Sequence, residues 1–523
     1  MTTADSLHEP KLVKSSAVVG SATMLSRVLG LLRDVVLANL IGANGNADAF
    51  FVAFKIPNFL RRLFAEGAFA QAFVPVLADT REHGGQAAVR ALVDRVAGVL
   101  GGTLLVLTLI TVMASPVVAT IFAPGFLRDP AKLALTGDLI KLTFPYLFLI
   151  SLTGFAGAIL NSYQRFAVPA LTPILLNLSL IAAALWFAPG FDEPVVALAL
   201  GVLIAGFTQL LFQVPALAGI GLVPRPRWAP RHEGVRRIMV LMVPALFGVS
   251  VSQINLLLDT VLASLLPTGS VSWLYYSDRL TELPLGVFAI AIATVILPTL
   301  SGQRARADDP AFASTLSWAI RSVLLIAIPA TLALAVLAEP LLATLFQYGA
   351  FGGDDRAMAA ASLRAYTLGL GAFMLVKVLA PGFYAREDMR TPVRIGIIAM
   401  VANMVLNVAF VFPLMWWLNL GHVGLALATS VSAWLNALLL FRGLRRDAVL
   451  PQGSLPFKWL VQVTAATAAM VAVLLWLMPD HTMWAEWLWW QRALQLGILC
   501  SAGLGVFGLS LLCCGVRPSD LRR

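Results

Sequence analysis

The chain has 523 residues, of which 59% are apolar and only 12% are charged, and its mean hydropathy is +0.85. A soluble domain carries about 25% charged residues. The composition therefore excludes an ordinary soluble enzyme, a disordered protein and a coiled coil. In a soluble protein the formal net charge of +10 would point to nucleic acid, but the positions of the basic residues give that charge another origin.

Apolar windows separated by polar segments predict fourteen transmembrane helices, because one span needs about 20 apolar residues. In chain order the predicted helices cover 16–41, 49–78, 91–115, 135–159, 169–188, 195–220, 238–265, 272–300, 316–338, 361–384, 393–416, 422–441, 459–478 and 492–514. The predicted fold class is an all-α polytopic membrane protein.

The basic residues lie almost entirely in alternate connections between these helices. One set of connections holds most of them, and the other set holds only Arg128, Lys132 and Arg356. Because cytoplasmic loops carry the excess of Lys and Arg, both termini are predicted to be cytoplasmic. The positive charge then reflects membrane topology, and no nucleic-acid partner is expected. The three cysteines all lie in the last apolar segment, without the spacing of a metal site.

An internal duplication is visible in the sequence. Asp34 opens the segment DVVLANL in the first predicted helix, and Asp259 opens the similar segment DTVLASL in the seventh. Asn177 and Asn403 are separated by almost the same length of chain. Two further pairs lie in nearly the same register, Pro75 with Pro298 and Tyr163 with Tyr384. Four landmarks at nearly one offset indicate two homologous halves of six helices each.

The predicted domains follow from this duplication. They are a cytoplasmic tail (1–14), an N-lobe (15–220), a linker (221–236), a C-lobe (237–442), a second linker (443–458), an additional helix pair (459–514) and a C-terminal tail (515–523). Six is an even number, so both lobes have the same orientation, and a central cavity between them can open to either side in turn. A duplicated pore or a duplicated membrane enzyme is the alternative.

Ionisable residues inside the predicted helices are the candidates for function, because a charge near the bilayer centre costs about 2.5–3.5 kcal/mol on insertion scales. The first helix contains Arg27 and Arg33, the latter next to Asp34. An unwound turn at Gly30 could direct both arginines into one space.

The second helix carries a polar stripe that we expect to line the cavity. Its members share an arc of about 80° on an ideal helix, and they are Asp48, Lys55, Asn58, Arg62 and Glu66. Arg61 lies off this stripe unless Pro57 kinks the helix.

The eighth helix repeats the pattern over an arc of about 120°, with Ser272, Tyr275, Asp278, Arg279 and Glu282. For any single Arg–acid pair, a structural ion bridge is the simpler interpretation. Several arginines converging on one wet cavity instead favour a phosphorylated or polyanionic headgroup, because guanidinium groups match phosphate oxygens bidentately.

A second polar group falls on other helices. Asp259 lies in the seventh, Asn403 and Asn407 at i, i+4 in the eleventh, and Thr429 in the twelfth. Carboxylate and amide oxygens suit a hard cation such as sodium, and Asp259 could instead carry a proton. Interhelical hydrogen bonding explains the same residues equally well.

Lys377 in the tenth helix is a further candidate. It is either a snorkelling surface lysine or a third cationic contact in the cavity, and a helix break at Pro381 and Gly382 favours the cavity. Motifs for phosphate-cradling glycine loops, serine hydrolases or zinc proteases are absent from the sequence, so a transporter rather than an enzyme is predicted.

Several long motifs carry a family resemblance. SRVLGLLRD from Ser26 and DAFFVAFKIPNFLRRLFAEGAFAQAFVP from Asp48 resemble the N-terminal signature of the MurJ (MviN) family of bacterial lipid II flippases. So do PALFGVSVSQI, GSVSWLYYSDRLTE, FQYG and VKVLAPGFYAR further along the chain. The resemblance extends over the twelve duplicated helices and more loosely into the last two.

The resemblance implies a fold and a cargo. Such proteins belong to the multidrug/oligosaccharidyl-lipid/polysaccharide exporter superfamily, and their last two helices are thought to form a groove for the polyprenyl tail. The implied cargo is lipid II, the undecaprenyl-pyrophosphate-linked disaccharide-pentapeptide, moved from the cytoplasmic to the periplasmic leaflet of the bacterial inner membrane during peptidoglycan biosynthesis. Membrane lipids and cell-wall synthesis proteins are the other implied partners.

The resemblance also assigns roles to residues. The headgroup-binding positions are Arg27, Arg33, Lys55, Asn58, Arg61, Arg62, Ser272 and Arg279, and the gating or charge-balancing positions are Asp48, Glu66, Asp278 and Glu282. From their places in the helices, and not from the resemblance, Asp34 and Lys377 join the gating or charge-balancing group. A sodium site of some members matches Asp259, Asn403, Asn407 and Thr429. No cofactor is expected, and the driving force is membrane potential or an ion gradient of Na⁺ or H⁺. A multidrug or cation antiporter of the same superfamily and a non-transporting scaffold for cell-wall synthesis remain the alternatives.

Overall fold

The computed structural model describes residues 9–62, 69–451, 453, 455–480 and 483–516, and within these ranges it contains helices, turns and loops but no strand. The predicted all-α class is therefore confirmed. The chain divides into two compact units, Met1–Val271 and Ser272–Arg523, and each is described by itself.

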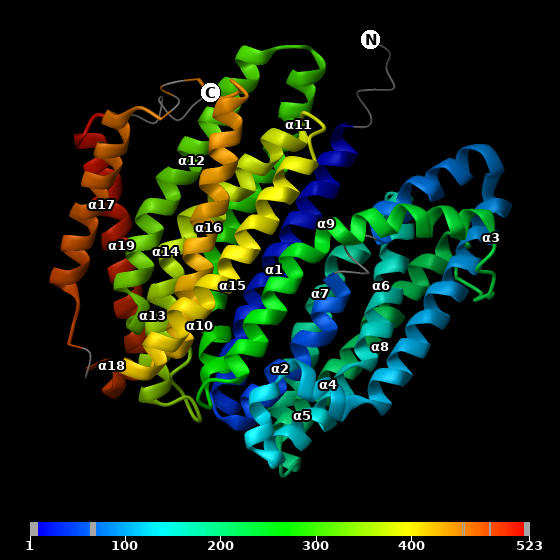
Figure 1. Ribbon diagram of the computed structural model, residues 1–523, viewed down its shortest axis with the longest axis horizontal. Helices are drawn as coiled ribbons and strands as arrows, with labels where there is room; N and C mark the ends of the chain where they lie inside the picture. The colour runs from blue at the N-terminus through cyan, green and yellow to red at the C-terminus, as the bar shows by residue number, and fades with distance from the viewer. Residues whose placement is uncertain (1–8, 63–68, 452, 454, 481–482, 517–523) are drawn as a thin grey trace. The chain divides into compact units, whose positions relative to one another are not determined.

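The first unit contains these helices, whose bounds differ in places from the predicted spans. They are α1 (Glu9–Ile41), α2 (Gly45–Arg61), α3 (Phe69–Met113), α4 (Ser115–Phe122), the 3₁₀ turn η2 (Pro124–Arg128), α5 (Pro130–Thr143), α6 (Pro145–Ser162), α7 (Ala167–Ala182) with η3 (Ala183–Phe187) and η4 (Ala188–Gly190), α8 (Pro194–Gly219) and α9 (Glu233–Ser264) (Figure 1). Side-chain caps start two of them: the Asn44 carboxamide accepts the N–H of Ala47, and the Asp129 carboxylate accepts the N–H of Lys132.

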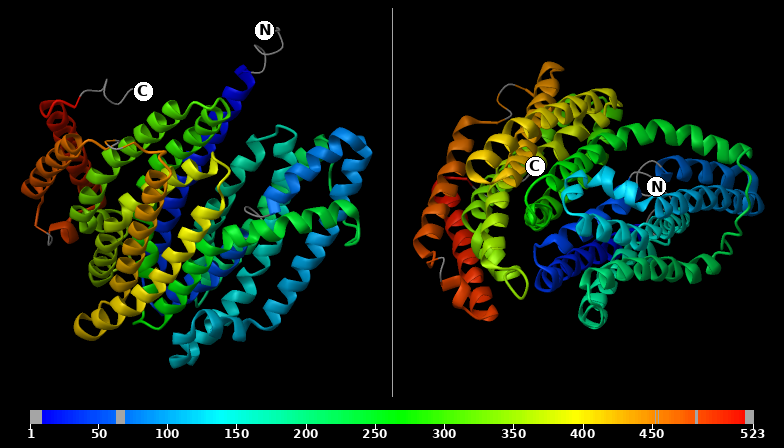
Figure 2. Two further views of the ribbon diagram at one scale, coloured as in Figure 1. Left: turned by 45° about the horizontal axis from the view of Figure 1, so that its top comes forward. Right: turned by 60° about the horizontal axis from the view of Figure 1, so that its bottom comes forward.

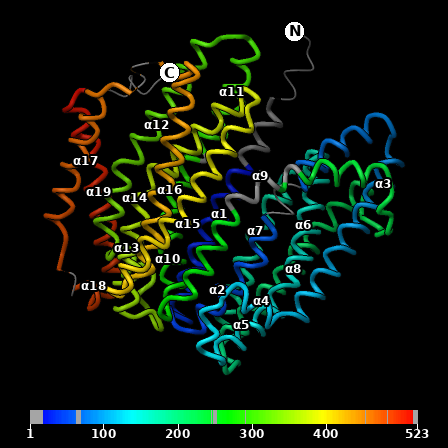
Figure 3. The backbone as a smooth tube through the Cα atoms, viewed as in Figure 1, coloured from blue at the N-terminus to red at the C-terminus, as the bar shows by residue number. Residues whose placement is uncertain are grey.

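Helix α3 holds parts of two predicted spans. At Gly85 its backbone is not helical, with φ of +68°, and α3 is accordingly bent into two arms in Figure 3. A positive φ is readily adopted only by glycine. The two arms pack with α6 and α9, and the first unit's core is formed here by Phe73, Val93, Phe155 and Ile238, among others.

The second unit contains the remaining helices. They are α10 (Ser270–Pro284, of which 272–284 belong to this unit) with the π-turn η5 (Leu285–Ala289), α11 (Ile290–Ala305), α12 (Asp309–Val336), α13 (Ala338–Leu345), α14 (Gly353–Tyr384), α15 (Arg390–Leu418), α16 (Gly421–Arg446), α17 (Phe457–Leu477), α18 (Met483–Glu486) and α19 (Trp489–Cys513). Helices α11, α12, α14 and α16 surround a core that includes Leu316, Met374 and Leu440.

The last helices are part of this second unit. Helix α17 packs on α12 and α19, and α19 packs on α13; the orange and red helices lie side by side in both views of Figure 2. A separate apolar cluster joins these helices. It includes Leu337 between α12 and α13, Leu474 of α17 and Leu499 of α19, all nearly inaccessible to solvent.

Eleven helices among the described residues are long and apolar enough to cross a membrane. The chain is therefore a multi-pass membrane protein, and the count of fourteen spans stays a prediction. The predicted domain boundaries also stay predictions. In the structure, α9 packs with α2, α3 and α4 in the first unit, and the two units divide at Val271.

The duplication has a counterpart in the backbone. The short helix α4 starts at Ser115 and the short helix α13 at Ala338, a separation close to that of the sequence landmarks, and each has 8 residues. Left-handed residues end three helical segments in each unit at matching positions: Gly85, Gln164 and Gly221 in the first, and Ala307, Glu387 and Ala448 in the second.

Candidate functional site

The first buried charge in the first unit is Arg33 of α1, which is 3% exposed. Its Nε and Nη2 donate to Asp34 Oδ1 at 3.0 and 2.7 Å, and its Nη1 donates to Asn177 Oδ1 of α7 at 3.0 Å. The amide of Asn177 donates in turn to the Ser26 carbonyl at 3.0 Å. The Arg33 guanidinium is therefore fixed by hydrogen bonds to Asp34 and Asn177, and the Asp34 carboxylate balances its charge.

The prediction of an unwound turn at Gly30 is wrong. Helix α1 runs unbroken from Glu9 to Ile41. Gly30 instead makes room for a neighbour, because a Cβ there would lie 3.7 Å from Nδ2 of Asn177. Arg27 shares this helix and is half-buried, and no hydrogen bond or ion pair joins it to another described residue.

Asp48 at the start of α2 forms a second buried pair. Its Oδ2 accepts from Nζ of Lys132 at 3.0 Å and from the N–H of Gly269 at 2.8 Å, and the Asp48 and Lys132 side chains are nearly inaccessible. The Lys132 ammonium also lies 4.0 Å from the centre of the Phe126 ring. Sequence reasoning placed Lys132 in a connecting loop and missed this contact, because nothing local relates residues 48 and 132.

The rest of the predicted stripe on α2 has separate environments. Lys55 Nζ donates to Thr260 Oγ1 of α9 at 3.4 Å, whereas Asn58 donates to the Phe54 carbonyl of its own helix at 2.9 Å. Arg61 is half-buried and Arg62 is exposed. Glu66 lies outside the described residues. Asp48 and Lys55 thus contact different helices, and Asn58 bonds within its own helix. The single polar wall along α2 stays a prediction.

In the second unit, α10 carries the second arginine site. Arg279 Nη1 bonds to Glu282 Oε2 at 2.9 Å, and its guanidinium lies 5.5 Å from the centre of the Tyr275 ring. This pair is one-third to two-fifths exposed. Ser272 is fully buried, and Asp278 is half-buried.

The polar group on α15 and α16 forms a compact hydrogen-bonded network. Asn407 donates to Asn403 Oδ1 at 3.0 Å, and Asn403 donates to Ser432 Oγ at 3.3 Å and to Thr429 Oγ1 at 3.4 Å. This is the interhelical hydrogen bonding that was the alternative to a cation site. Asp259 lies on α9 of the first unit, where Asn255 donates to it at 3.5 Å. The four-residue sodium site stays a prediction.

Lys377 is exposed on α14. The predicted break at Pro381 and Gly382 is wrong, since α14 is continuous to Tyr384. Helix α14 instead uses Gly382 for close packing, with a Cβ there 3.2 Å from side-chain atoms of Leu316 and Leu444.

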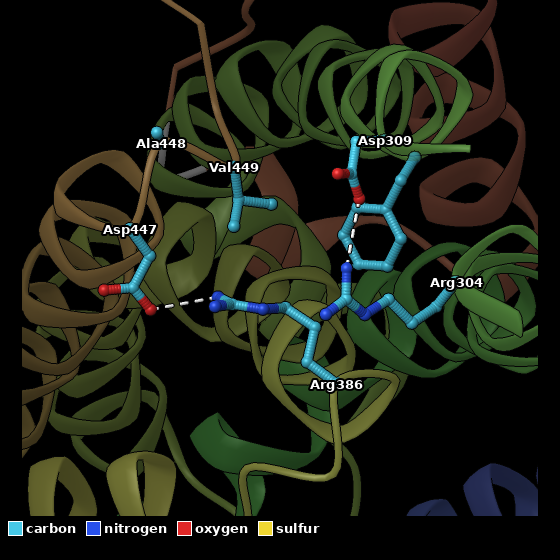
Figure 4. A pocket seen from close by; sticks show the side chains of 7 residues that line it. Arg304, Asp309, Arg386, Asp447, Ala448 and Val449 are labelled. Carbon is cyan, nitrogen blue, oxygen red and sulfur yellow. Dashed lines mark hydrogen bonds and ion pairs between the residues drawn. The ribbon is translucent and has the colours of Figure 1, made fainter. Parts of the chain in front are cut away.

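A pocket lies where three turns of the second unit meet (Figure 4). Arg304 bonds to Asp309 at 3.1 Å and Arg386 to Asp447 at 2.9 Å. In the adjacent turn, hydrogen bonds from Thr391 lower the pKa of Asp388. From the sequence, the basic residues of such connections were used only to predict membrane topology. In the structure, Arg304 and Arg386 also form ion pairs that join the ends of helices.

Arg492 at the start of α19 was not predicted as a functional residue. It is 6% exposed, and four carbonyls accept its hydrogen bonds at 2.9–3.1 Å: Ala343 and Gln347 at the end of α13, and Ala485 and Trp487 beside α18. No carboxylate among the described residues forms a salt bridge with it. A lone arginine at a helix end resembles an interfacial anchor in sequence, so only the fold reveals this contact.

The candidate site thus consists of buried or half-buried cations in each unit. Arg27, Arg33 and Lys55 lie in the first, and Arg279 lies in the second. The predicted convergence of these groups on one cavity stays a prediction. Ionisable groups inside apolar helical bundles mark substrate or ion pathways among other functional sites, and guanidinium groups form strong hydrogen bonds with phosphate and carboxylate groups.

The fold and these intramembrane cations define a class, the polytopic helical transporters. A solved multidrug resistance transporter of the MATE family, from the MOP superfamily, in an inward-facing conformation has a TM-score of 0.66 at 16% identity, over 83% of this chain and 98% of its own, which shows a common fold.

Closer relatives define the family. A family model for the lipid II flippase MurJ matches residues 37–492. A probable lipid II flippase MurJ of Vibrio cholerae serotype O1 is 49% identical over 519 residues, 98% of each chain. A solved lipid II flippase MurJ in an inward closed conformation has a TM-score of 0.77 at 25% identity, over 94% of this chain and 98% of its own. The chain belongs to the MurJ family, whose members are bacterial inner-membrane transporters and not enzymes.

Proposed function

We propose that the chain flips lipid II from the cytoplasmic to the periplasmic leaflet, and so supplies the precursor for peptidoglycan synthesis. The observation that carries this proposal is the match over 98% of both chains to a protein named as a probable lipid II flippase. The buried and half-buried arginines of α1 and α10 agree with a cargo that carries a pyrophosphate.

The arginines differ in how they meet the headgroup. Arg27 has no acidic partner among the described residues and makes the first contact with the pyrophosphate. Arg33 and Arg279 are paired with Asp34 and Glu282, so they exchange a carboxylate for a phosphate oxygen or bind both. A guanidinium fork donates to a carboxylate and to a phosphate with the same bidentate geometry.

Several finer points belong to the same proposal. Both termini are cytoplasmic, because the basic residues lie mostly in one alternate set of connections and cytoplasmic loops carry the excess of Lys and Arg. The lipid tail lies along α17 and α19. The two predicted lobes, 15–220 and 237–442, alternate access, driven by membrane potential or by a gradient of Na⁺ or H⁺, since each charge crossing the field contributes about 2.3 kcal/mol per 100 mV. Asp259, Asn403, Asn407 and Thr429 are the groups for a coupling ion.

The test is complementation of a strain depleted of its own flippase. Arg27→Ala and Arg279→Ala should abolish growth while the protein stays in the membrane, because each loses charge-assisted hydrogen bonds of about 1.5–3 kcal/mol, roughly tenfold to a hundredfold in headgroup affinity. The matched control is Arg90→Ala, at an exposed arginine of α3, which should complement fully. Full growth with both Arg27→Ala and Arg279→Ala would remove the arginine site from the proposal.

A further inference from the structure

The segment between α8 and α9, residues 222–232, is docked on α3 in the first unit. The N–H of Arg225 donates to Asp94 Oδ1 at 2.7 Å, and the N–H of Arg227 donates to the Asp94 carbonyl at 2.9 Å. Asp94 itself is 6% exposed. A buried carboxylate that accepts a backbone N–H group fixes a loop in one conformation, so this segment, the strap, has a defined position.

Two glycines of α3 let the strap approach closely. A Cβ at Gly98 would overlap the carbonyl of Arg227, and a Cβ at Gly102 would lie 2.6 Å from the indole of Trp228. Any larger residue at either position would displace the strap.

Residues of the strap, among them Pro224, Pro226 and Trp228, line part of an apolar groove of about 560 Å³. Gly101 of α3, Phe148 and Leu152 of α6, and Leu210 and Val214 of α8 line it, with Trp228 at the strap end. This volume is in the range of ordinary ligand sites. These lining residues offer only apolar side-chain surface apart from the indole N–H of Trp228, so the groove suits a hydrocarbon chain.

The charged residues at the strap are all basic except for Glu233. Arg225, Arg227 and Arg231 are exposed, Glu233 at the start of α9 is exposed, and His232 is half-buried. Arg95 Nη1 lies 3.1 Å from Nε2 of His232, and burial together with this guanidinium keeps the pKa of His232 below its usual value. The 66% exposed Trp228 is a residue type that favours the membrane interface.

We infer that this groove is a binding site for an anionic phospholipid, with one acyl chain between α3, α6 and α8 and the headgroup phosphate at the arginines of the strap. A basic residue near a membrane surface attracts anionic lipid by about 1 kcal/mol. Three exposed arginines in the segment that lines an apolar groove therefore favour an anionic over a zwitterionic lipid. This lipid site is independent of the proposed cargo.

The first experiment tests the groove. The full chain is reconstituted in vesicles of phosphatidylcholine and phosphatidylglycerol with a phosphatidylglycerol probe that carries a diazirine on its acyl chain, and crosslinked peptides are identified by mass spectrometry. Labelling of the peptides that contain Gly101 and Leu152 is expected. Gly101→Leu should reduce it at least about tenfold, since a Cβ at Gly101 meets only ordinary contacts of 3.9–4.0 Å and the longer side chain fills the groove.

The matched control is Gly219→Leu at the end of α8, where a Cβ meets no atom within 4 Å. It should label as the unsubstituted chain does. Thermal unfolding of both variants should be unchanged, which separates groove filling from misfolding. Equal labelling of Gly101→Leu and Gly219→Leu would overturn the inference.

The second experiment tests the headgroup. Arg225→Gln with Arg227→Gln keeps both backbone bonds to Asp94 and removes two charges, so labelling by the phosphatidylglycerol probe should fall about thirtyfold, from about 1 kcal/mol for each arginine. Arg442→Gln with Arg446→Gln, at exposed arginines of α16, is the control and should not change it. Equal labelling by a phosphatidylcholine probe, or stronger labelling by a polyprenyl phosphate probe, would contradict an anionic phospholipid site.

Discussion

At the scale of single residues, nearly inaccessible charges are paired in more than one way. Arg33 has one carboxylate and one amide, Lys132 has one carboxylate and an aromatic ring, and Arg492 has four carbonyls. Each arrangement satisfies the donors of a group that is costly to bury alone. Arg27 lacks such a set among the described residues, which is why it is the best candidate for contact with cargo.

The Asp48–Lys132 pair gives a stability prediction. Lys132→Met should lower the free energy of unfolding by about 3–5 kcal/mol, because it leaves a buried carboxylate without its cation. Adding Asp48→Asn should restore part of the loss. Thermal or denaturant unfolding in detergent measures both.

Lys141→Met on the same helix is the control for this pair. Lys141 bonds to Asp138 at 2.8 Å, but the two side chains are 48% and 65% exposed, so the change should cost less than about 1 kcal/mol. Similar losses of unfolding free energy for Lys132→Met and Lys141→Met would show that the buried pair contributes no more to stability than the exposed one.

The sequence predicted which residues are charged inside helices but not how they are partnered. Glu282 three residues after Arg279 could be predicted as its partner, because residues i and i+3 are neighbours on a helix surface. Asp34 directly follows Arg33, and helical spacing alone does not predict their contact. The pairing of Lys132 with Asp48 could not be predicted, since that contact depends on the packing of α2 against α5. Asn177 was visible only as a duplication landmark; its role beside Arg33 required the tertiary structure.

At the scale of elements, several helices of this fold end at residues with a left-handed backbone conformation. Non-glycine residues adopt positive φ at Gln164, Ala307, Glu387 and Ala448, where the turn geometry overrides the usual preference for glycine. These turns were expected as polar connections, and their left-handed conformation could not be predicted from Ala or Glu. The expected helix breaks at Gly30 and Pro381 are absent, since α1 and α14 continue through them. Gly30 and Gly382 instead make room for side chains of neighbouring helices.

Arg492 gives a prediction at this scale. Arg492→Met should loosen α19 from α13 and reduce the free energy of unfolding by at least about 1.5–3 kcal/mol, since hydrogen bonds from a charged donor are lost to buried carbonyls. Arg492→Lys should recover part of it. Amide hydrogen exchange in the first turns of α19 should rise with Arg492→Met.

Arg364→Met is the matched control for Arg492. Arg364 bonds to Glu339 at 3.0 Å but is 45% exposed, so its loss should cost under about 1 kcal/mol and leave exchange in α19 unchanged. If the two variants behave alike, Arg492 does not hold the last helices to the second unit.

At the scale of the whole molecule, composition and repetition predicted the class correctly. The apolar windows predicted helical segments in both units, although the span predicted over 49–78 covers α2 and the start of α3. The offset between the sequence landmarks appears again between the short helices α4 and α13. The assignment of α9 differs: sequence symmetry makes it the first helix of the second half, whereas its contacts with α2, α3 and α4 place it in the first unit. Internal homology groups α9 with the second half of the sequence, whereas packing groups it with the first unit, so the two ways of dividing the chain give different boundaries here.

The most direct test of translocation is the leaflet distribution of lipid II in cells that have this chain as their only flippase. Lipid II accessible to a membrane-impermeant reagent in the periplasm is measured before and after rapid depletion of the chain. We predict that the accessible fraction falls while total lipid II rises, and that re-expression restores it but Arg27→Ala does not. An accessible fraction that is unchanged after depletion would contradict translocation of lipid II by this chain.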